Sequence, residues 1–299
     1  MPIIDFPAEF DLDYYRKAYP ELKFLIDEGL TAHYKKFAAE RGHSACPYDL
    51  RENLQRLLQN EIDRRQLKVL EIGCGAFPFF VGGSVKYFEI VDAETLRADV
   101  LKEGRTPERV PEKIHFVSPT GDLGIVDEKF DIVFTSHVVE HTPDLIEHLQ
   151  NVSRILNAGG LYILAVPDKR FCFDHFNTES TLAEVIDAFV NERKIPRLAD
   201  VLASYCTGTH NSATLHWLGD HGEFGGDLTR EKIFRAVEEY SVALERGEYI
   251  NVHNWRFTPD SFGYIVNMLN KLNFIDLPLY RLCHTVWGRF EFIAMLEKK

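Results

Sequence analysis

Side chains that can accept a proton or ligate a metal are concentrated between Pro167 and Phe257. The group comprises Asp174, His175, His210, His216, Asp220, His221 and His253. Histidine titrates near neutral pH and therefore suits a general base. The histidines at 210, 216 and 221 with the aspartate at 220 could instead hold a divalent ion. We favour a polar surface that recognises a ligand by hydrogen bonds and ring stacking, and we expect no metal.

A glycine turn is the second candidate site. Residues 69–78 read VLEIGCGAFP, and Gly73 and Gly75 allow the backbone to turn sharply and approach a ligand. A dinucleotide fingerprint needs a third glycine where this chain has Pro78, and Glu71 would stand beside the pyrophosphate. S-adenosylmethionine is cationic at its sulfonium and ammonium groups and has no phosphate. The turn therefore favours S-adenosylmethionine over NAD, with Cys74 packed beneath it.

Acidic residues follow the next two expected strands. Asp92 comes about twenty residues after the turn, where a carboxylate would bind both ribose hydroxyls, and Glu94 is the alternate. An exposed helix cap is the structural alternative for Asp92. Asp122 and Leu123 follow the third strand, where an acid can accept a hydrogen bond from the adenine amino group. For Asp122 the alternative is ordinary Gly-Asp turn chemistry.

The elements that must position these residues alternate along the chain. We expect strands at 68–72, 87–91, 114–117, 129–135 and 161–166, with helices at 78–84, 94–103 and 143–156. This alternation predicts a parallel, doubly wound α/β sheet with its ligand at the carboxyl ends of the strands. A helix at 259–271 and strands at 273–280 and 286–296 would close the sheet as an antiparallel hairpin.

Two regions lie outside this alternation. Residues 1–66 have helical patterns at 11–19, 22–39 and 49–67, which predict a helical extension docked beside the first strand. Residues 67–299 would form the main domain. Helices at 181–193, 196–204 and 229–246 would belong to an inserted cap at about 167–257.

Composition excludes several classes of protein. The chain has 299 residues, 45% of them hydrophobic, and a net charge of −12, which disfavours a non-specific grip on nucleic acid. Five scattered cysteines without CxxC spacing argue against a disulfide framework and a structural zinc site. The sequence shows no signal peptide and no apolar run long enough to span a membrane. These features predict a cytoplasmic protein.

The segments VLEIGCG, IVD, FDIVFTSHVVEHTPDL and ILNAGGLYILAVPD together resemble the motif series of class I S-adenosylmethionine-dependent methyltransferases. The resemblance covers roughly 68–167 and 259–296. It implies a Rossmann-like, seven-stranded sheet with the last strand antiparallel. It also implies that Gly73, Gly75, Asp92, Asp122 and the His137 region line the cofactor. The chain departs from the pattern at Phe77 and Pro78, where many members keep a further glycine.

A finer resemblance concerns the acceptor. The segments at 167–176, 210–222 and 252–262 look like a bacterial methyltransferase group associated with glycosyltransferases of surface polysaccharides, and the N-terminal segment is similar to one attached to such glycosyltransferases. The resemblance implies O-methylation of a carbohydrate or sugar-linked acceptor in polysaccharide biosynthesis, with a glycosyltransferase as an associated protein. Alternatives are methylation of another small metabolite, or a non-catalytic cofactor-binding partner of a glycosyltransferase.

Roles in the cap follow from this resemblance. The loop after the fifth strand opens onto the methyl group in this fold, so we favour His175 as the base, with Asp174 and His253 as further catalytic candidates. The acceptor-binding candidates are Lys169, Arg170, His210, His216, Trp217, His221 and Trp255. Lys169 and Arg170, beside Arg256, could bind a phosphate or form a solvated basic patch. Some quinone-pathway relatives bind metal through a Glu-His pair like Glu140-His141. Ser136 stands where those relatives would need an acid, so we interpret the pair as structural or as neighbours of the cofactor's methionine end.

Overall fold

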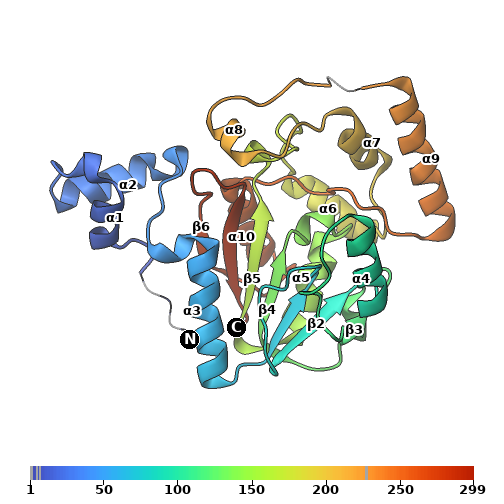
Figure 1. Cartoon of the computed structure of the whole chain (residues 1–299), viewed down its shortest axis with the longest axis horizontal. Helices are drawn as coiled ribbons and strands as arrows, with labels where there is room; N and C mark the ends of the chain where they lie inside the picture. The colour runs from blue at the N-terminus through green and yellow to red at the C-terminus, as the bar shows by residue number, and fades with distance from the viewer. Residues whose placement is uncertain (1–2, 5, 7, 226–227) are drawn as a thin grey trace.

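A seven-stranded sheet forms the centre of the protein in the computed structural model (Figure 1). The structure describes residues 3–4, 6, 8–225 and 228–299. The strands are β1 (Val69–Ile72), β2 (Val85–Glu89), β3 (Phe116–Val117), β4 (Phe130–Ser136), β5 (Leu156–Pro167), β6 (Leu279–Cys283) and β7 (Glu291–Glu297). Their order is β3-β2-β1-β4-β5-β7-β6, and β7 is antiparallel to both of its neighbours while the other pairs are parallel. This order confirms the predicted doubly wound sheet with its last strand antiparallel.

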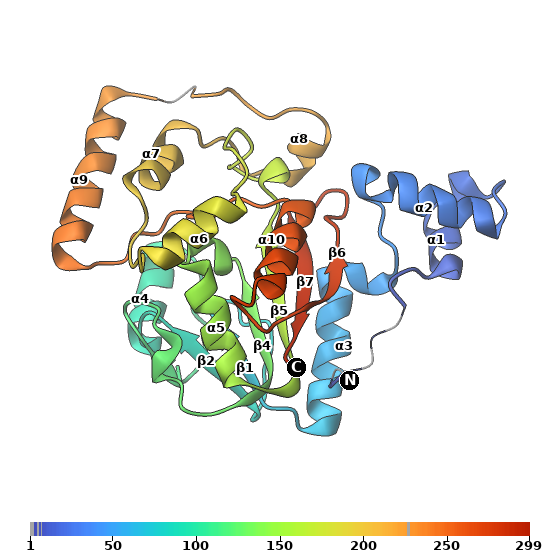
Figure 2. The ribbon, with the colours of Figure 1, turned by 180° about the vertical axis from the view of Figure 1, so that it is seen from behind.

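Helices cover both faces of the sheet (Figure 2). On one face α5 (Leu145–Ile155) and α10 (Pro259–Lys271) pack over Leu70, Ile72 and Val133. On the other face α3 (Arg51–Arg65) packs over Val69 and Ile132, and α4 (Ala93–Lys102) contributes Ala93 and Leu96 to the same cluster nearer the β3 edge of the sheet. Successive side chains of a strand point to opposite faces, so a strand buried on both sides is apolar throughout. This explains the continuous hydrophobic runs of β1, β4 and β5.

The N-terminal segment has two parts. Helix α3 presents Leu54, Leu58 and Ile62 to the core beneath β1 and therefore docks on the sheet as expected. Helices α1 (Leu12–Ala18) and α2 (Asp27–Arg41) form a small separate cluster around Tyr15 and Leu30. The short 3-10 helices η1 (Pro20–Leu22) and η2 (Pro47–Asp49) connect these elements.

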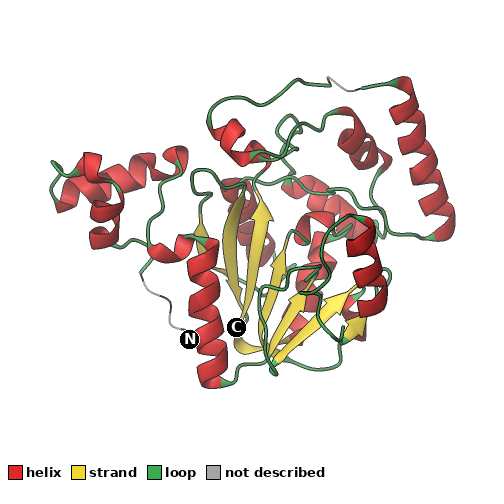
Figure 3. Ribbon diagram, viewed as in Figure 1, coloured by secondary structure: helices red, strands yellow, loops and turns green. Residues whose placement is uncertain are grey.

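A helical cap lies over the carboxyl end of β5 (Figures 1 and 3). It contains η5 (Lys169–Phe171), α6 (Leu182–Val190), α7 (Leu198–Cys206), α8 (Ala213–Trp217) and α9 (Arg230–Arg246). Helices α7 and α9 share a small core that includes Val201, Ala236 and Ala243. The two ends of the cap meet, because the Lys169 N–H donates to the Phe257 carbonyl at 2.9 Å. Within the described ranges, no helix is both long and apolar enough to cross a bilayer.

The helix predicted at 78–84 does not form. The Phe79 and Phe80 N–H groups donate instead to the two oxygens of Glu71, at 2.7 and 3.0 Å. The side chain of Gln59 on α3 accepts from the Val81 N–H at 3.2 Å and donates to the Val81 carbonyl at 2.9 Å. Side chains of neighbouring elements thus take the bonds that a helix would have needed, and Pro78 begins a loop.

Several strand boundaries also differ from the prediction: β3 begins at Phe116 and not at 114, and β5 begins at Leu156 and not at 161. β6 begins at Leu279, because residues 273–278 form the connection that follows the left-handed Asn273 (φ 60°) at the end of α10. β7 begins at Glu291, after a turn at Gly288 (φ 76°), so the strand predicted at 286–296 is too long at its start. β2 ends at Glu89, two residues earlier than the prediction at 87–91. Because β2 ends at Glu89, the acidic residue at the end of this strand is Glu89 and not Asp92.

Candidate active site

The glycine turn after β1 requires its two glycines for different reasons. Both have positive φ, 72° at Gly73 and 53° at Gly75, where a side chain is strained. A Cβ on Gly73 would lie 2.4 Å from Cγ2 of Val138, so this position is also closed by packing. A Cβ on Gly75 would meet no atom within 4 Å. The turn therefore packs against the loop after β4 on one side and is open at Gly75.

Glu71 supports this turn from below. Its side chain is buried, and both of its oxygens accept backbone N–H bonds from Phe79 and Phe80. Burial raises the pKa of this carboxyl to about 7, although those bonds oppose the shift. Glu71, which was predicted to bind the cofactor, thus binds the backbone of the following loop. Its charge would act on a bound ammonium group from within the core.

Asp92 and Glu89 lie in different surroundings near the end of β2, and the ribose contact predicted for Asp92 stays a prediction. Asp92 is exposed and caps α4, where its carboxylate accepts from the Thr95 N–H at 2.8 Å. Glu89 is the last residue of β2, is 8% exposed, and accepts from the Gly75 N–H at 2.7 Å. Burial raises the pKa of the Glu89 carboxyl. Glu89 therefore binds the glycine turn directly. A correct prediction of where β2 ends would have identified this residue.

The residues after β3 form a separate turn. Asp122 is exposed, and its carboxylate accepts from the Gly124 N–H at 2.7 Å at the start of η3 (Leu123–Ile125). Leu123 is buried, and its carbonyl accepts from the guanidinium of Arg154 at 2.7 Å. The ordinary turn chemistry weighed for Asp122 is present, and its predicted contact with adenine stays a prediction.

His137 holds the end of β4 against β7. It is left-handed (φ 55°), and its Nε2 lies 2.7 Å from Oε2 of Glu291, which also pairs with Arg51 at 2.7 Å. Burial of the ring lowers its pKa, but the hydrogen bond to Glu291 and the charge of Glu140 raise the pKa by more. His137 thus joins the end of β4 to β7, with its pKa raised by these acidic neighbours.

A buried carboxylate follows within η4 (Val139–His141). Glu140 is 1% exposed, and among the described residues neither of its side-chain oxygens has a hydrogen-bond partner. Its Oε1 lies 3.8 Å from Nε2 of His141 and 3.9 Å from Nε2 of His253. Burial raises the pKa of Glu140 and lowers that of His141 to about 3. These three residues offer ligand atoms within 4.8 Å of one another and could hold a cation.

Asp174 and His253 form a hydrogen-bonded pair beside Glu140. Nδ1 of His253 lies 2.5 Å from Oδ2 of Asp174, and both side chains are buried. Burial alone would raise the pKa of Asp174, but His253 and the nearby Arg256 lower the pKa by more. The Nδ1–H group of His253 donates to the Asp174 carboxylate, so the lone pair of the ring is on Nε2. Nε2 faces Glu140. The arrangement resembles the orienter and base of an acid–base pair.

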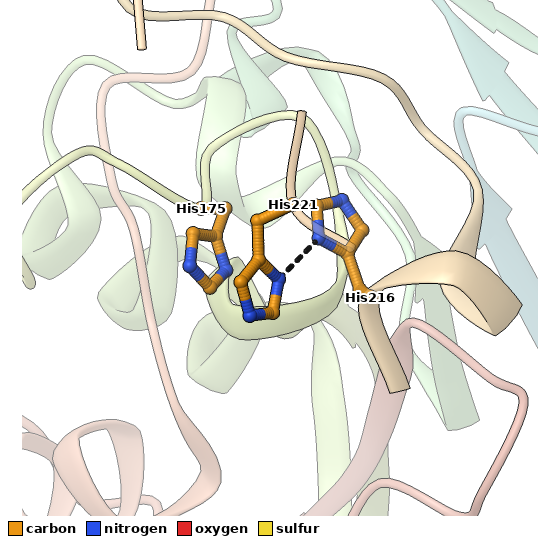
Figure 4. A group of neighbouring side chains, drawn as sticks. All are labelled: His175, His216 and His221. Atoms are coloured by element: carbon orange, nitrogen blue, oxygen red, sulfur yellow. Dashed lines mark hydrogen bonds between the residues drawn. The ribbon is translucent and has the colours of Figure 1, made fainter. Parts of the chain in front are cut away.

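His175 lies apart from this pair. Its ring stacks on that of His221 with centroids 3.7 Å apart, and His216 stacks beside them (Figure 4). The predicted catalytic candidates therefore separate into the Asp174–His253 pair and a histidine cluster formed by His175, His216 and His221.

The predicted acceptor-binding residues are mostly held by the protein itself. The guanidinium of Arg170 pairs with the buried Asp168 at 2.6 Å, and the ammonium of Lys169 donates to the His175 carbonyl at 2.9 Å. Trp255 is 1% exposed and packs in the core below the cap, with its indole N–H donating to a backbone carbonyl. Trp217 stacks on Phe171 at 3.8 Å.

Arg256 and His210 are also engaged. Arg256 pairs with Asp200 at 2.8 Å, and Nε2 of His210 lies 3.1 Å from the Asp220 carbonyl. Lys169, Arg170 and Arg256 thus each bind a partner within the protein, and binding of a phosphate by these residues stays a prediction.

A cleft of about 360 Å³ opens in the cap beside the acid–base pair. Ser204, Thr209, Asn211 and Lys232 contribute polar groups to its lining, and Phe173 forms part of its wall. The ring of Phe173 lies 4.7 Å from that of His253. Sequence patterns could not identify this cleft, because its lining comes from α7, α9 and three loop segments whose packing is set only by the cap fold.

Residues 41–220, more than half of the chain, match the family model described as a methyltransferase domain. The chain belongs to this family. The family and the strand order together confirm the predicted class I methyltransferase with S-adenosylmethionine as cofactor.

Individual relatives are distant. The malonyl-[acyl-carrier protein] O-methyltransferase of Pseudescherichia vulneris is 28% identical over 177 residues, which cover 51% of this chain and 67% of that protein. The polyketide synthase Preu5 of Preussia isomera is 27% identical over 158 residues, 48% of this chain but 6% of that protein.

Solved structures are more distant still. An S-adenosylmethionine-dependent methyltransferase from Clostridium acetobutylicum has a TM-score of 0.39 at 9% identity, covering 94% of this chain and 98% of its own. The Synechocystis magnesium protoporphyrin IX methyltransferase, with bound SAH, has a TM-score of 0.35 at 10% identity, covering 96% and 98%. At these scores the structural similarity adds nothing to the strand order.

Proposed function

We propose that this methyltransferase transfers the methyl group of S-adenosylmethionine to a hydroxyl of a carbohydrate or sugar-linked acceptor. The observation that carries the proposal is the polar cleft of the cap, whose wall residue Phe173 contacts His253. Hydroxyl, amide and ammonium groups line the cleft, and these groups suit an acceptor rich in hydroxyls. In this proposal the glycine turn and Glu89 hold the cofactor, and the cap holds the acceptor.

His253 is the proposed base. A hydroxyl must lose its proton as the new carbon–oxygen bond forms, and a neutral imidazole at Nε2 can accept that proton. Asp174 fixes the tautomer and would stabilise the imidazolium that results. His175, which the sequence favoured, directs its ring toward two other histidines instead. The sulfonium is already activated, so orientation and exclusion of water supply much of the remaining catalysis.

The unpartnered carboxylate of Glu140 supports a second mechanism at the same place. A divalent cation held by Glu140, His141 and His253 would lower the pKa of an acceptor hydroxyl directly. The two mechanisms differ in their response to a chelator. Loss of activity in EDTA, restored by Mg²⁺ or Mn²⁺, would favour the cation, whereas activity that persists in EDTA favours His253 acting alone.

The distant carrier-protein relative suggests a different acceptor, a carrier-bound carboxylate. A carboxylate is already ionised at neutral pH and needs no base. The acceptor class therefore predicts the effect of changing His253. With a hydroxyl acceptor, the His253→Gln substitution should lower kcat by about 10²–10⁴-fold and leave the affinity for S-adenosylhomocysteine unchanged. With a carboxylate acceptor, kcat should change less than tenfold.

The test measures S-adenosylhomocysteine formation with a panel of sugar nucleotides, glycan extracts and malonyl-carrier protein, followed by product mass and linkage. His284→Gln, which changes a half-exposed histidine outside both histidine groups, is the matched control. Methylation of the carrier-bound acid alone would overturn the carbohydrate proposal. Co-purification with a glycosyltransferase encoded by the same organism tests the proposed association, and cofactor binding without turnover on any acceptor would indicate a non-catalytic partner.

A further inference from the structure

We propose that His175, His216 and His221 bind one divalent transition-metal ion, most naturally Zn²⁺, which ties the loop after β5 to the α8 segment of the cap (Figure 4). The three side chains each offer a ring nitrogen, and these nitrogens lie within 4.8 Å of one another. The histidines come from η5–α6 and from α8 and the turn after it, so the ion would connect two segments distant in sequence.

Backbone carbonyls set the orientation of two of these rings. Nε2 of His216 lies 3.0 Å from the His210 carbonyl, so it must carry the proton and leave a lone pair on Nδ1. Nδ1 of His175 lies 2.8 Å from the Arg170 carbonyl and must likewise donate, which leaves the lone pair on Nε2. A ligating histidine almost always donates its other ring N–H in this way. Nδ1 of His216 and Nε2 of His175 therefore each keep a lone pair that can ligate a metal ion.

The spacing of one pair of nitrogens, on His216 and His221, fits tetrahedral coordination, and the His175 ring, which stacks on that of His221, must turn to bring its Nε2 lone pair to the same ion. Nδ1 of His216 and Nδ1 of His221 are 3.1 Å apart. Zinc–nitrogen bonds of about 2.0–2.1 Å at tetrahedral angles place two ligand nitrogens about 3.3 Å apart. Without an ion, a proton on His221 must bridge the two atoms, and an ion would take the place of that proton. Three neutral imidazoles favour zinc, copper or nickel over magnesium or calcium.

The surrounding contacts hold His216 and His221 in place. The Thr209 N–H donates to the Phe173 carbonyl at 3.0 Å, and its hydroxyl donates to the His221 carbonyl at 2.6 Å. Trp217, next to His216, stacks on Phe171. His216 is 2% exposed while the other two ligands are half-buried, so the site is supported from within and reachable from solvent. A fourth position remains for water or an acceptor oxygen.

The experiment measures metal binding by the purified full-length chain in the absence of cofactor and acceptor. Zn²⁺ content is determined after dialysis, affinity by competition with a chromogenic chelator, and coordination by the visible absorption of the Co²⁺ form. The variants are His216→Ala and the more exposed His221→Gln, with His284→Ala as the matched control. Circular dichroism verifies that each variant is folded, and Glu140→Gln separates this cluster from the Glu140 group.

We expect one Zn²⁺ per wild-type chain, a tetrahedral Co²⁺ spectrum, and affinity reduced at least 100-fold in both cluster variants. The control and Glu140→Gln should bind as wild type does. Absence of stoichiometric Zn²⁺ in the wild type, or unchanged affinity in folded His221→Gln, would overturn the site. So would loss of binding in Glu140→Gln alone. Because no methyl transfer is measured, these outcomes are independent of the acceptor proposal.

Discussion

Replacing Glu71 by glutamine should stabilise the protein above pH 7. Burial raises the pKa of this carboxyl to about 7 from an ordinary 4.5, although the N–H groups of Phe79 and Phe80 favour the anion. Between these values the folded chain holds a proton that the unfolded chain has released. The stability that Glu71 contributes is therefore complete below about pH 4.5 and is lost as the pH rises through 7.

The size of this effect follows from the interval between the two pKa values. Each pKa unit corresponds to about 1.4 kcal/mol, so the interval from 4.5 to about 7 amounts to about 3 kcal/mol. Glutamine has the shape of the protonated acid and one acceptor oxygen, but it does not ionise. The two proteins should therefore agree to about 1 kcal/mol at pH 5, and the variant should be more stable by about 3 kcal/mol at pH 8.

The assay is guanidinium unfolding of both proteins at intervals from pH 5 to 8. Glu94→Gln, an exposed change in the first turn of α4, is the control and should follow the wild type throughout. The reasoning would be refuted if the free energies of unfolding of wild type and Glu71→Gln changed with pH by the same amount. A variant that is less stable at pH 8 would show that the two backbone hydrogen bonds outweigh the burial of the charge.

Two further predictions concern the buried core and the glycine turn. Burial lowers the pKa of His148 from 6.5 to about 4, so the free energy of unfolding falls as the pH drops through this interval. The His148→Gln substitution should remove about 2 kcal/mol of the fall between pH 7 and 5, and urea unfolding measures it. Equal pH dependence in both proteins would contradict this. Gly73→Ala should cost at least about 1 kcal/mol more than Gly75→Ala, because its Cβ would also collide with Val138; thermal unfolding compares the two, and equal midpoints would count against it.

The sheet could be predicted from the sequence because its signals are local. Hydrophobic runs such as β1 and β4 and the paired glycines at 73 and 75 specify buried strands and a sharp turn without knowledge of distant residues. The alternation of strands and helices then predicts a parallel, doubly wound sheet. Even the antiparallel closing hairpin was indicated by two consecutive strands after α10.

The errors arose where side chains distant in sequence decide the local structure. Pro78 suits a helix start, but Glu71 and Gln59 satisfy the backbone of residues 79–81 and hold it as a loop. The boundary of β2 decided which acid joins the glycine turn, and strand ends are poorly specified by propensity. Within the cap, nothing in the spacing separates His175 from Asp174, although their adjacent side chains point to different clusters.

The cap leaves and rejoins the domain at a single point. Asp168 at the end of β5 forms a bridge with Phe257, so the two ends of the insertion are backbone neighbours. Because the ends of the insertion meet, the length of chain between them places little strain on the end of β5. The insertion nevertheless supplies Val185, Ala188 and Trp255 to the core that covers one face of the sheet. Any segment that replaced it at this junction would have to supply equivalent apolar contacts.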